Sequence, residues 1–156
     1  MSSAISIQRV SRLANIPSDR LLRKWVNAAL AGIKAASGSE VTLRIVNAAE
    51  GRNLNSAFRG KDYPTNILTF VYHEKKSSIL LGDLVICAEV VAHEAKDQHK
   101  TLADHYAHLC VHGILHLGGF DHESSRDAKR MESLEVKILA GLGIGNPYRD
   151  DGQYPD

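Results

Sequence analysis

The sequence predicts a single α+β domain in which helices pack mainly on one side of a mixed sheet of about four strands. Three observations indicate this fold class. Short runs rich in β-branched residues are interspersed with longer runs of helical periodicity. The chain of 156 residues has the usual length of one domain, and neither a repeat nor a low-complexity segment divides it. We assign residues 1–146 to the domain and residues 147–156 (PYRDDGQYPD) to a polar C-terminal tail.

The N-terminal half contains most of the expected strands. Ile5 and Ile7 alternate with polar neighbours, as an edge strand would. A start signal at residues 17–19 (PSD) predicts a helix that ends before Gly38. Its apolar residues recur at helical spacing: Leu21, Leu22, Trp25, Val26, Ala29, Leu30 and Ile33. Three further strands are expected at residues 41–45, 67–71 and 79–87. Residues 53–66 begin with a short helix and end in a proline-containing loop, a type of segment that often presents functional side chains.

The C-terminal half is predicted to be helical. A helical pattern covers residues 90–117, with a break near 97–101, and it ends at the glycine pair 118–119. Both glycines permit the positive φ that stops a helix. A final helix is expected over residues 124–141, because the S-x-x-D sequence at 124–127 resembles a capping box.

The overall composition excludes several classes of protein. Lys+Arg number 19 and Asp+Glu 18, so the net charge of +1 neither attracts nor repels a polyanion, and any contact with nucleic acid must be local. Two cysteines, Cys87 and Cys110, are too few for a disulfide framework. No apolar run approaches 18 residues and no secretory signal is visible. We therefore expect a soluble, cytoplasmic protein with no membrane partner.

The strongest functional signal is the spacing H-x3-H-x5-H formed by His112, His116 and His122. Residues four apart on a helix share one face, here about 6 Å apart along the axis. Two imidazoles so placed can bind one ion at Zn–N distances of about 2.0–2.1 Å. The glycine pair that follows lets the chain turn back, so that the third histidine can reach the same ion. Three protein ligands leave one tetrahedral position for water, which is typical of catalytic zinc.

These histidines predict one Zn²⁺ per chain, although three imidazoles also suit nickel, copper or iron. His108 lies four residues before His112, but a triad of 108, 112 and 116 would spread the ligands over about 12 Å of helix. His108 is therefore interpreted as a residue of the cleft wall or a packed histidine. Asp121, next to the third ligand, is a candidate to orient a ligand imidazole, and a turn-forming role is the alternative.

The segment HGILHLGGFDH at residues 112–122 can be compared with the motifs of two families of metalloenzyme. The metalloprotease motif H-E-x-x-H-x-x-G-x-x-H has the same histidine offsets, but its general base, Glu, is replaced here by Gly113. The string instead resembles the H-G-x-L-H-L-x-G-Y-D-H signature of the YbeY family. LNSAFRGKDYPTNILTF (54–70) and LGDLVIC (81–87) are also similar to that family's segments, so the resemblance covers most of residues 54–139.

The resemblance implies a metal-dependent endoribonuclease that acts on single-stranded RNA, in 16S rRNA 3′-end maturation and ribosome quality control. It implies that His112, His116 and His122 are the metal ligands and that Arg59 is a functional residue facing the site. It also implies ribosomal or small-subunit partners, and no DNA substrate is expected. Where the family usually has Tyr before the Asp-His pair, this chain has Phe120, which puts any role of that hydroxyl in doubt.

The expected chemistry is phosphodiester hydrolysis assisted by the metal, with Arg59 binding the scissile phosphate. Two alternatives remain open at this point: a zinc metallopeptidase, and a non-catalytic ribosome-assembly factor with a structural metal. Candidate RNA-guiding cations are Lys61, Lys75, Lys76, Arg126, Lys129 and Arg130. Candidate base-stacking aromatics are Tyr63, Tyr72 and Phe120, for which core packing is the alternative.

Overall fold

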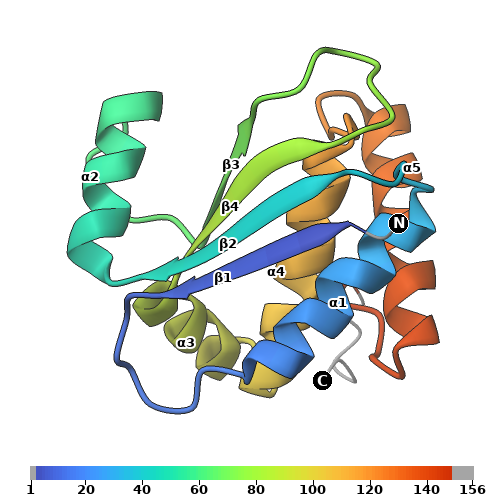
Figure 1. Ribbon diagram of the computed structural model, residues 1–156. Coiled ribbons are helices and arrows are strands. Elements are labelled where there is room, and N and C mark those ends of the chain that lie inside the picture. The colour runs from blue at the N-terminus through green and yellow to red at the C-terminus, as the bar shows by residue number, and fades with distance from the viewer. Residues whose placement is uncertain (1–2, 149–156) are drawn as a thin grey trace.

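The computed structural model describes residues 3–148, and these form one α+β domain (Figure 1). The elements follow in the order β1 (Ala4–Arg9), α1 (Asp19–Gly32), β2 (Glu40–Val46), α2 (Ala48–Arg59), β3 (Ile67–Val71), β4 (Leu81–Cys87), α3 (Ala88–Asp97), α4 (Leu102–Leu117) and α5 (Ser125–Gly141). The predicted fold class, with its four-stranded mixed sheet, is confirmed.

The sheet has the strand order β1-β2-β4-β3. β1, β2 and β4 are parallel, whereas β3 runs antiparallel to β4, with Thr69 opposite Leu84. Two strands therefore lie at edges: β1, as predicted, and β3. Alternate side chains of β2 and β4, such as Leu43 and Ile86, are fully buried against the helices. On the other face a smaller cluster of Val46, Leu68 and Val85 packs against Leu54 of α2.

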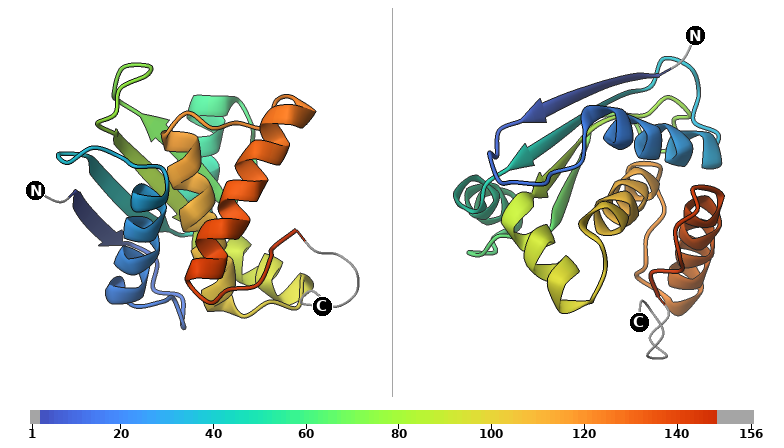
Figure 2. Two further views of the ribbon diagram at one scale, coloured as in Figure 1. Left: turned by 90° about the vertical axis from the view of Figure 1, so that its right-hand side faces the viewer. Right: turned by 90° about the horizontal axis from the view of Figure 1, so that it is seen from below.

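The helices form two unequal groups. α1, α4 and α5 cover one face of the sheet, with α4 between the sheet and α5 (Figure 2), while α2 packs on the other face against β4 and α3 contacts both α2 and α4. Side-chain caps start three helices near the predicted positions: Ser18 for α1, Thr101 for α4 and Ser124 for α5. The predicted break separates α3 from α4. The short helix starts at Ala48, five residues before the prediction, because Asn47 caps it.

Gly113 brings α4 unusually close to the sheet. A Cβ atom added there would lie 2.7 Å from Ile67 Cδ1 and 3.0 Å from Leu84 Cδ2. Any larger side chain would have to displace the ends of these two side chains, since interiors of this density do not absorb extra volume freely. The glycine thus allows close packing between the sheet and the helix that carries His112 and His116.

The glycine pair after α4 differs from the prediction in one respect. Gly119 has the expected positive φ of 96°, but Gly118 has a φ of −79° that any residue adopts. A Cβ atom on Gly118 would instead lie 2.6 Å from Cδ1 of Ile33, the residue that follows α1. The first glycine therefore serves close packing, and only the second serves the turn.

Two further predictions concern the chain as a whole. Cys87 and Cys110 are both buried and free. Within residues 3–148, none of the helices combines the length and apolar character needed to cross a bilayer. Of the proposed C-terminal tail, Pro147 and Tyr148 belong to the described part, and residues 149–156 lie outside it.

Candidate metal centre

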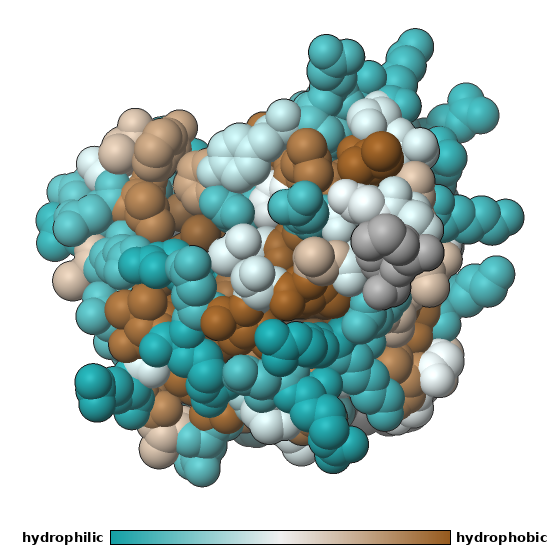
Figure 3. All heavy atoms as spheres, in the orientation of Figure 1, coloured by the Kyte–Doolittle hydropathy of each residue, from teal (hydrophilic) through white to brown (hydrophobic). Residues whose placement is uncertain are grey.

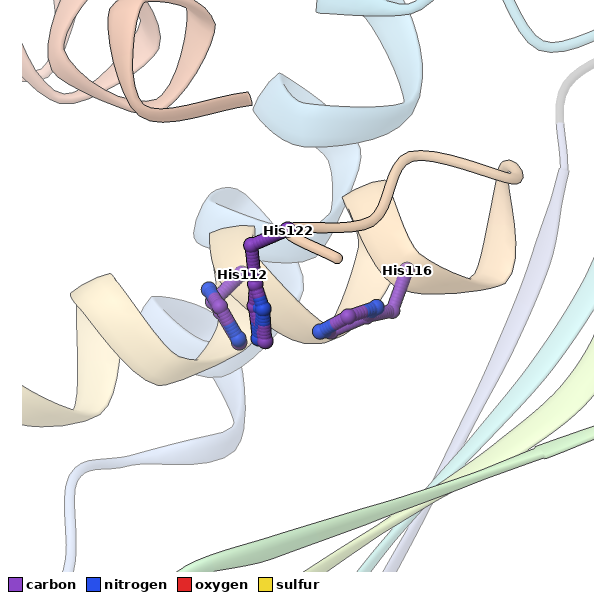
Figure 4. A group of neighbouring side chains, drawn as sticks. All are labelled: His112, His116 and His122. Carbon is purple, nitrogen blue, oxygen red and sulfur yellow. The ribbon is translucent and has the colours of Figure 1, made fainter. Parts of the chain in front are cut away.

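The three predicted histidines lie together. His112 and His116 are one turn apart on α4, and His122 comes from the loop that follows; Figure 4 shows their rings pointing toward one another. One ring nitrogen from each lies within 4.8 Å of the others. The ring centroids are separated by 4.6 Å for 112 and 116, 5.0 Å for 116 and 122, and 5.7 Å for 112 and 122. A single cation fits between three donors at this spacing.

The turn that returns His122 is held by backbone hydrogen bonds at the end of α4. The N–H groups of Gly119 and Phe120 donate to the carbonyls of His116 and Leu115, at 3.0 Å each. This closure, with the left-handed Gly119, reverses the chain within a few residues. Two of the three imidazoles are therefore positioned by a helix and the third by a short, closed loop.

A buried carboxylate supports the histidine cluster from behind. Glu135 of α5 is fully buried, and its two oxygens accept hydrogen bonds from His112 Nδ1 and from the Tyr148 hydroxyl. His108 Nε2 lies 3.4 Å from the same carboxylate. With a hydrogen bond from Nδ1 to Glu135, His112 presents Nε2 to the cluster, and metal-binding histidines are commonly oriented by a carboxylate in this way.

Of the two interpretations of Asp121, the structure agrees with the turn-forming one, and Glu135 is the carboxylate that contacts a histidine of the cluster. Asp121 accepts a hydrogen bond from the Glu123 N–H at 3.2 Å and so has the turn-forming role. Sequence reasoning missed Glu135, although a signal was present: it shares the buried face of α5 with Met131 and Ile138. A carboxylate on an apolar helical stripe needs a buried partner.

The pKa shifts favour a charged Glu135 carboxylate and the neutral forms of His108 and His116. Burial alone would raise the pKa of Glu135, but hydrogen bonds from His108, His112 and Tyr148 outweigh it and lower the pKa to about 2. Burial lowers the pKa of His116, and the charges of His112 and His122 lower it further. Burial also lowers the pKa of His108. Neutral imidazole is the form that binds a metal ion.

His108 does not complete a triad with His112 and His116. It contributes instead to a second group that could hold a metal, together with His112 and Glu135. In that group the carboxylate already accepts hydrogen bonds, whereas His112, His116 and His122 turn free nitrogens toward open space. His108 lines the cleft, in agreement with one of its two interpretations.

A cleft of about 790 Å³ opens over the histidines. Residues of α4, of strand β3 and of the last turn of α2 line it, together with loop residues that include His122. The lining residues are Phe58, Arg59, Thr65, Asn66, Ile67, Leu68, Thr69, Phe70, Val71, His108, Leu109, His112, His116, His122 and Tyr148. Arg59 is exposed and makes one long hydrogen bond, 3.4 Å from its Nη1 to Asn55 Oδ1, so its guanidinium is available to a ligand.

The other predicted RNA contacts lie elsewhere. None of the six candidate cations lines this cleft, and neither do Tyr63, Tyr72 or Phe120. Phe120 packs under Arg130, whose Cζ lies 5.3 Å from the ring centroid. The aromatic residues of the cleft are Phe58, Phe70 and Tyr148, which sequence reasoning did not select.

A single α+β domain whose three imidazoles converge on an open cleft defines a small hydrolase of the metal-dependent class. The family model described as Endoribonuclease YbeY matches residues 6–143. The chain belongs to the YbeY endoribonuclease family. The Endoribonuclease YbeY of Aromatoleum aromaticum is 52% identical over 148 residues, which is 93% of this chain and 92% of that protein. That of Alkalilimnicola ehrlichii is 51% identical over 144 residues, 90% of this chain and 87% of the relative.

The fold is similar to a solved structure as well. The solution structure of a Thermotoga maritima protein superposes with a TM-score of 0.58 at 23% identity, covering 92% of this chain and 99% of that one. This likeness concerns the fold, and it supports the arrangement of sheet and helices described above.

The contact between Glu135 and His112 leads to a prediction about metal affinity. Glu135→Gln removes the negative acceptor that orients His112, and we expect affinity for zinc to fall by about 10- to 100-fold. Competition with a chromophoric chelator measures this directly, without any activity assay. Asp121→Asn is the matched control, because Asp121 accepts a hydrogen bond from the turn backbone. The zinc affinity of this variant should stay near that of the wild type. An equal loss in both variants, in protein that melts normally, would contradict the role given to Glu135.

Proposed function

We propose that this chain cleaves single-stranded RNA at the histidine cleft, with ribosomal RNA, and the 3′ end of 16S rRNA in particular, as its substrate. The observation that carries the proposal is the convergence of three imidazoles and Arg59 on one open cleft, in a chain of an endoribonuclease family. Action on rRNA in ribosome maturation and quality control, with small-subunit proteins as partners, belongs to the same proposal.

The donor set fits a divalent transition metal. Three imidazoles with one open position suit zinc, and the hydrogen bond to Glu135 gives His112 the tautomer that a ligand needs. We take His112, His116 and His122 as the ligands and zinc as the metal. A zinc ion bound there supplies a Lewis acid that activates water and offsets charge on the phosphate.

The chain's own residues bind the phosphate and orient the imidazoles. Arg59 presents a planar fork that matches two phosphate oxygens, so it can bind the scissile group and stabilise the extra negative charge of the transition state. It stands on α2, opposite the histidines of α4, so the phosphate is held from both sides of the cleft. His112 is kept in one orientation by the Glu135 carboxylate, which limits the reorganisation needed during the reaction.

The peptidase alternative has a structural difficulty. In peptidases with the same histidine spacing, the residue after the first histidine is the glutamate base. Here that residue is Gly113, and a side chain at this position would meet Ile67 and Leu84 of the sheet. No observation favours a peptidase or a purely structural metal.

A substrate panel tests the proposal. Purified, zinc-loaded protein should cleave a single-stranded RNA that carries the 16S 3′ end, should cleave the same sequence poorly in a duplex, and should leave an unstructured peptide intact. The products are resolved on a denaturing gel and by mass spectrometry. Cleavage of the peptide with intact RNA would contradict the proposal and favour the peptidase.

A further inference from the structure

The wall of the cleft opposite the histidines carries an exposed aromatic ring next to the phosphate-binding residue. Phe58 lies in the last turn of α2 and is 66% exposed. Hydrophobic side chains gather over α2 in Figure 3, at the upper left. The Phe58 ring is supported edge-to-face by Phe70 of β3, with centroids 5.1 Å apart and planes at 76°. The Phe58 ring is thus held by Phe70 and remains largely exposed, as an aromatic side chain that stacks on a nucleobase would be.

The edge of β3 offers hydrogen-bonding groups in the same cleft. Cys87 N–H donates to the Asn66 carbonyl and Tyr72 N–H to that of Leu81, so even-numbered residues of β3 pair with β4. The odd-numbered residues therefore direct their backbone groups to the open edge. The Ile67 N–H is already bonded to Asn66 Oδ1 at 2.7 Å. The first N–H of the strand that faces the open edge without such a side-chain bond is therefore that of Thr69, a residue that lines the cleft.

We propose that Phe58 and the open edge of β3 form a base-binding subsite, which holds the unpaired nucleobase next to the scissile phosphate. Phe58 directly precedes Arg59, so a phosphate bound by Arg59 brings the base of its own nucleotide within reach of the Phe58 ring. Backbone N–H and C=O groups at Thr69 then face the polar edge of that base. The inference rests on the proposed function and specifies which part of the RNA each wall of the cleft recognises.

This subsite accounts for a preference for single strands. In a duplex both faces of a base are stacked and its polar edge is paired, so neither Phe58 nor Thr69 can reach it. An unpaired base has both surfaces free. An added peptide strand is the other occupant that an open sheet edge accepts. RNA is favoured here because the edge is short and lies between Arg59 and the histidines.

The test combines RNA substrates that lack one nucleobase with a protein variant that lacks the Phe58 ring. Wild-type protein is given single-stranded RNAs in which one nucleotide at a time, beside the cleavage position, lacks its base. We expect one such position to lower kcat/KM by about tenfold, the usual effect of one stacked base. Phe58→Ala should lose a similar factor on intact RNA, mainly through KM, and should no longer respond to removal of that base. Phe58→Trp should restore both properties.

Two further variants make the result specific. Tyr63→Ala removes an aromatic side chain that is 54% exposed but outside the cleft, and it should behave as the wild type. Thr69→Pro removes an N–H that points to the open edge and leaves the ladder bonds of Leu68 and Phe70 in place. It should change the preference among bases while zinc content stays the same.

The subsite and the proposed function fail in different ways. Wild-type protein that cleaves RNA equally well whichever base is missing would overturn the subsite and leave the endoribonuclease intact. An unchanged KM in Phe58→Ala together with an unchanged preference among bases in Thr69→Pro would do the same. Absence of any RNA cleavage by zinc-loaded wild-type protein would instead refute the proposed function.

Discussion

His116→Ala is expected to abolish stoichiometric zinc binding and to lower RNA cleavage by on the order of 10³-fold or more, about 4 kcal/mol of transition-state stabilisation. His116 is the most informative ligand to remove, because it has no contact with the buried Glu135 carboxylate, unlike His112. Its loss leaves two donors, which do not enclose the ion. Elemental analysis and single-stranded RNA cleavage are measured on the same sample.

The matched control for this variant is a histidine outside the site. His93→Ala removes a ring on α3 that is 76% exposed and pairs with Asp97 one turn further along the helix. We expect it to retain wild-type zinc content and activity. A folded His116→Ala protein that supports ribosome maturation as well as the wild type would exclude catalysis at this centre, and would favour a non-catalytic assembly factor.

Arg59→Met should lower kcat/KM for RNA by about 10²- to 10³-fold, the range found when one preorganised donor to a developing negative charge is removed. The methionine keeps the length and apolar stem of the side chain and deletes the fork. Arg59→Lys should recover part of the loss, since it restores charge without the two-pronged geometry. Zinc content should be unaffected in both, because Arg59 belongs to α2 and the ligands do not.

A second arginine distinguishes phosphate binding in the cleft from a general effect of charge. Arg126→Met deletes an exposed arginine at the start of α5, outside the cleft. It changes the net charge by the same amount as Arg59→Met. Equal losses of activity in both variants would mean that Arg59 acts only through the field of the protein, and its role at the scissile phosphate would be wrong.

Local patterns were sufficient for most elements of the fold but not for their assembly. Helices α1, α4 and α5 follow from periodicity and capping residues, which act within a few positions. The early start of α2 at Ala48 was missed, because an Asn cap is a weak signal without a strong apolar stripe behind it. The antiparallel placement of β3 at an edge depends on pairing with β4, a contact between segments that local sequence does not encode.

The same distinction applies to the candidate site. His112, His116 and His122 are close in the chain, so helix geometry and one turn predict their convergence. Glu135 comes from another helix, and its partner is identified only by the packing of α5 on α4. Arg59 was selected by family resemblance, since nothing in its own neighbourhood distinguishes it from a surface arginine.

The close approach at Gly113 has a consequence for how this enzyme can vary. The atoms nearest to an added Cβ are the side-chain ends of Ile67, which also lines the cleft, and of buried Leu84. A bulkier residue at position 113 would have to displace both, and so would alter the cleft wall and the core packing in the same step. The shape of the cleft and thermodynamic stability are thereby coupled at this position.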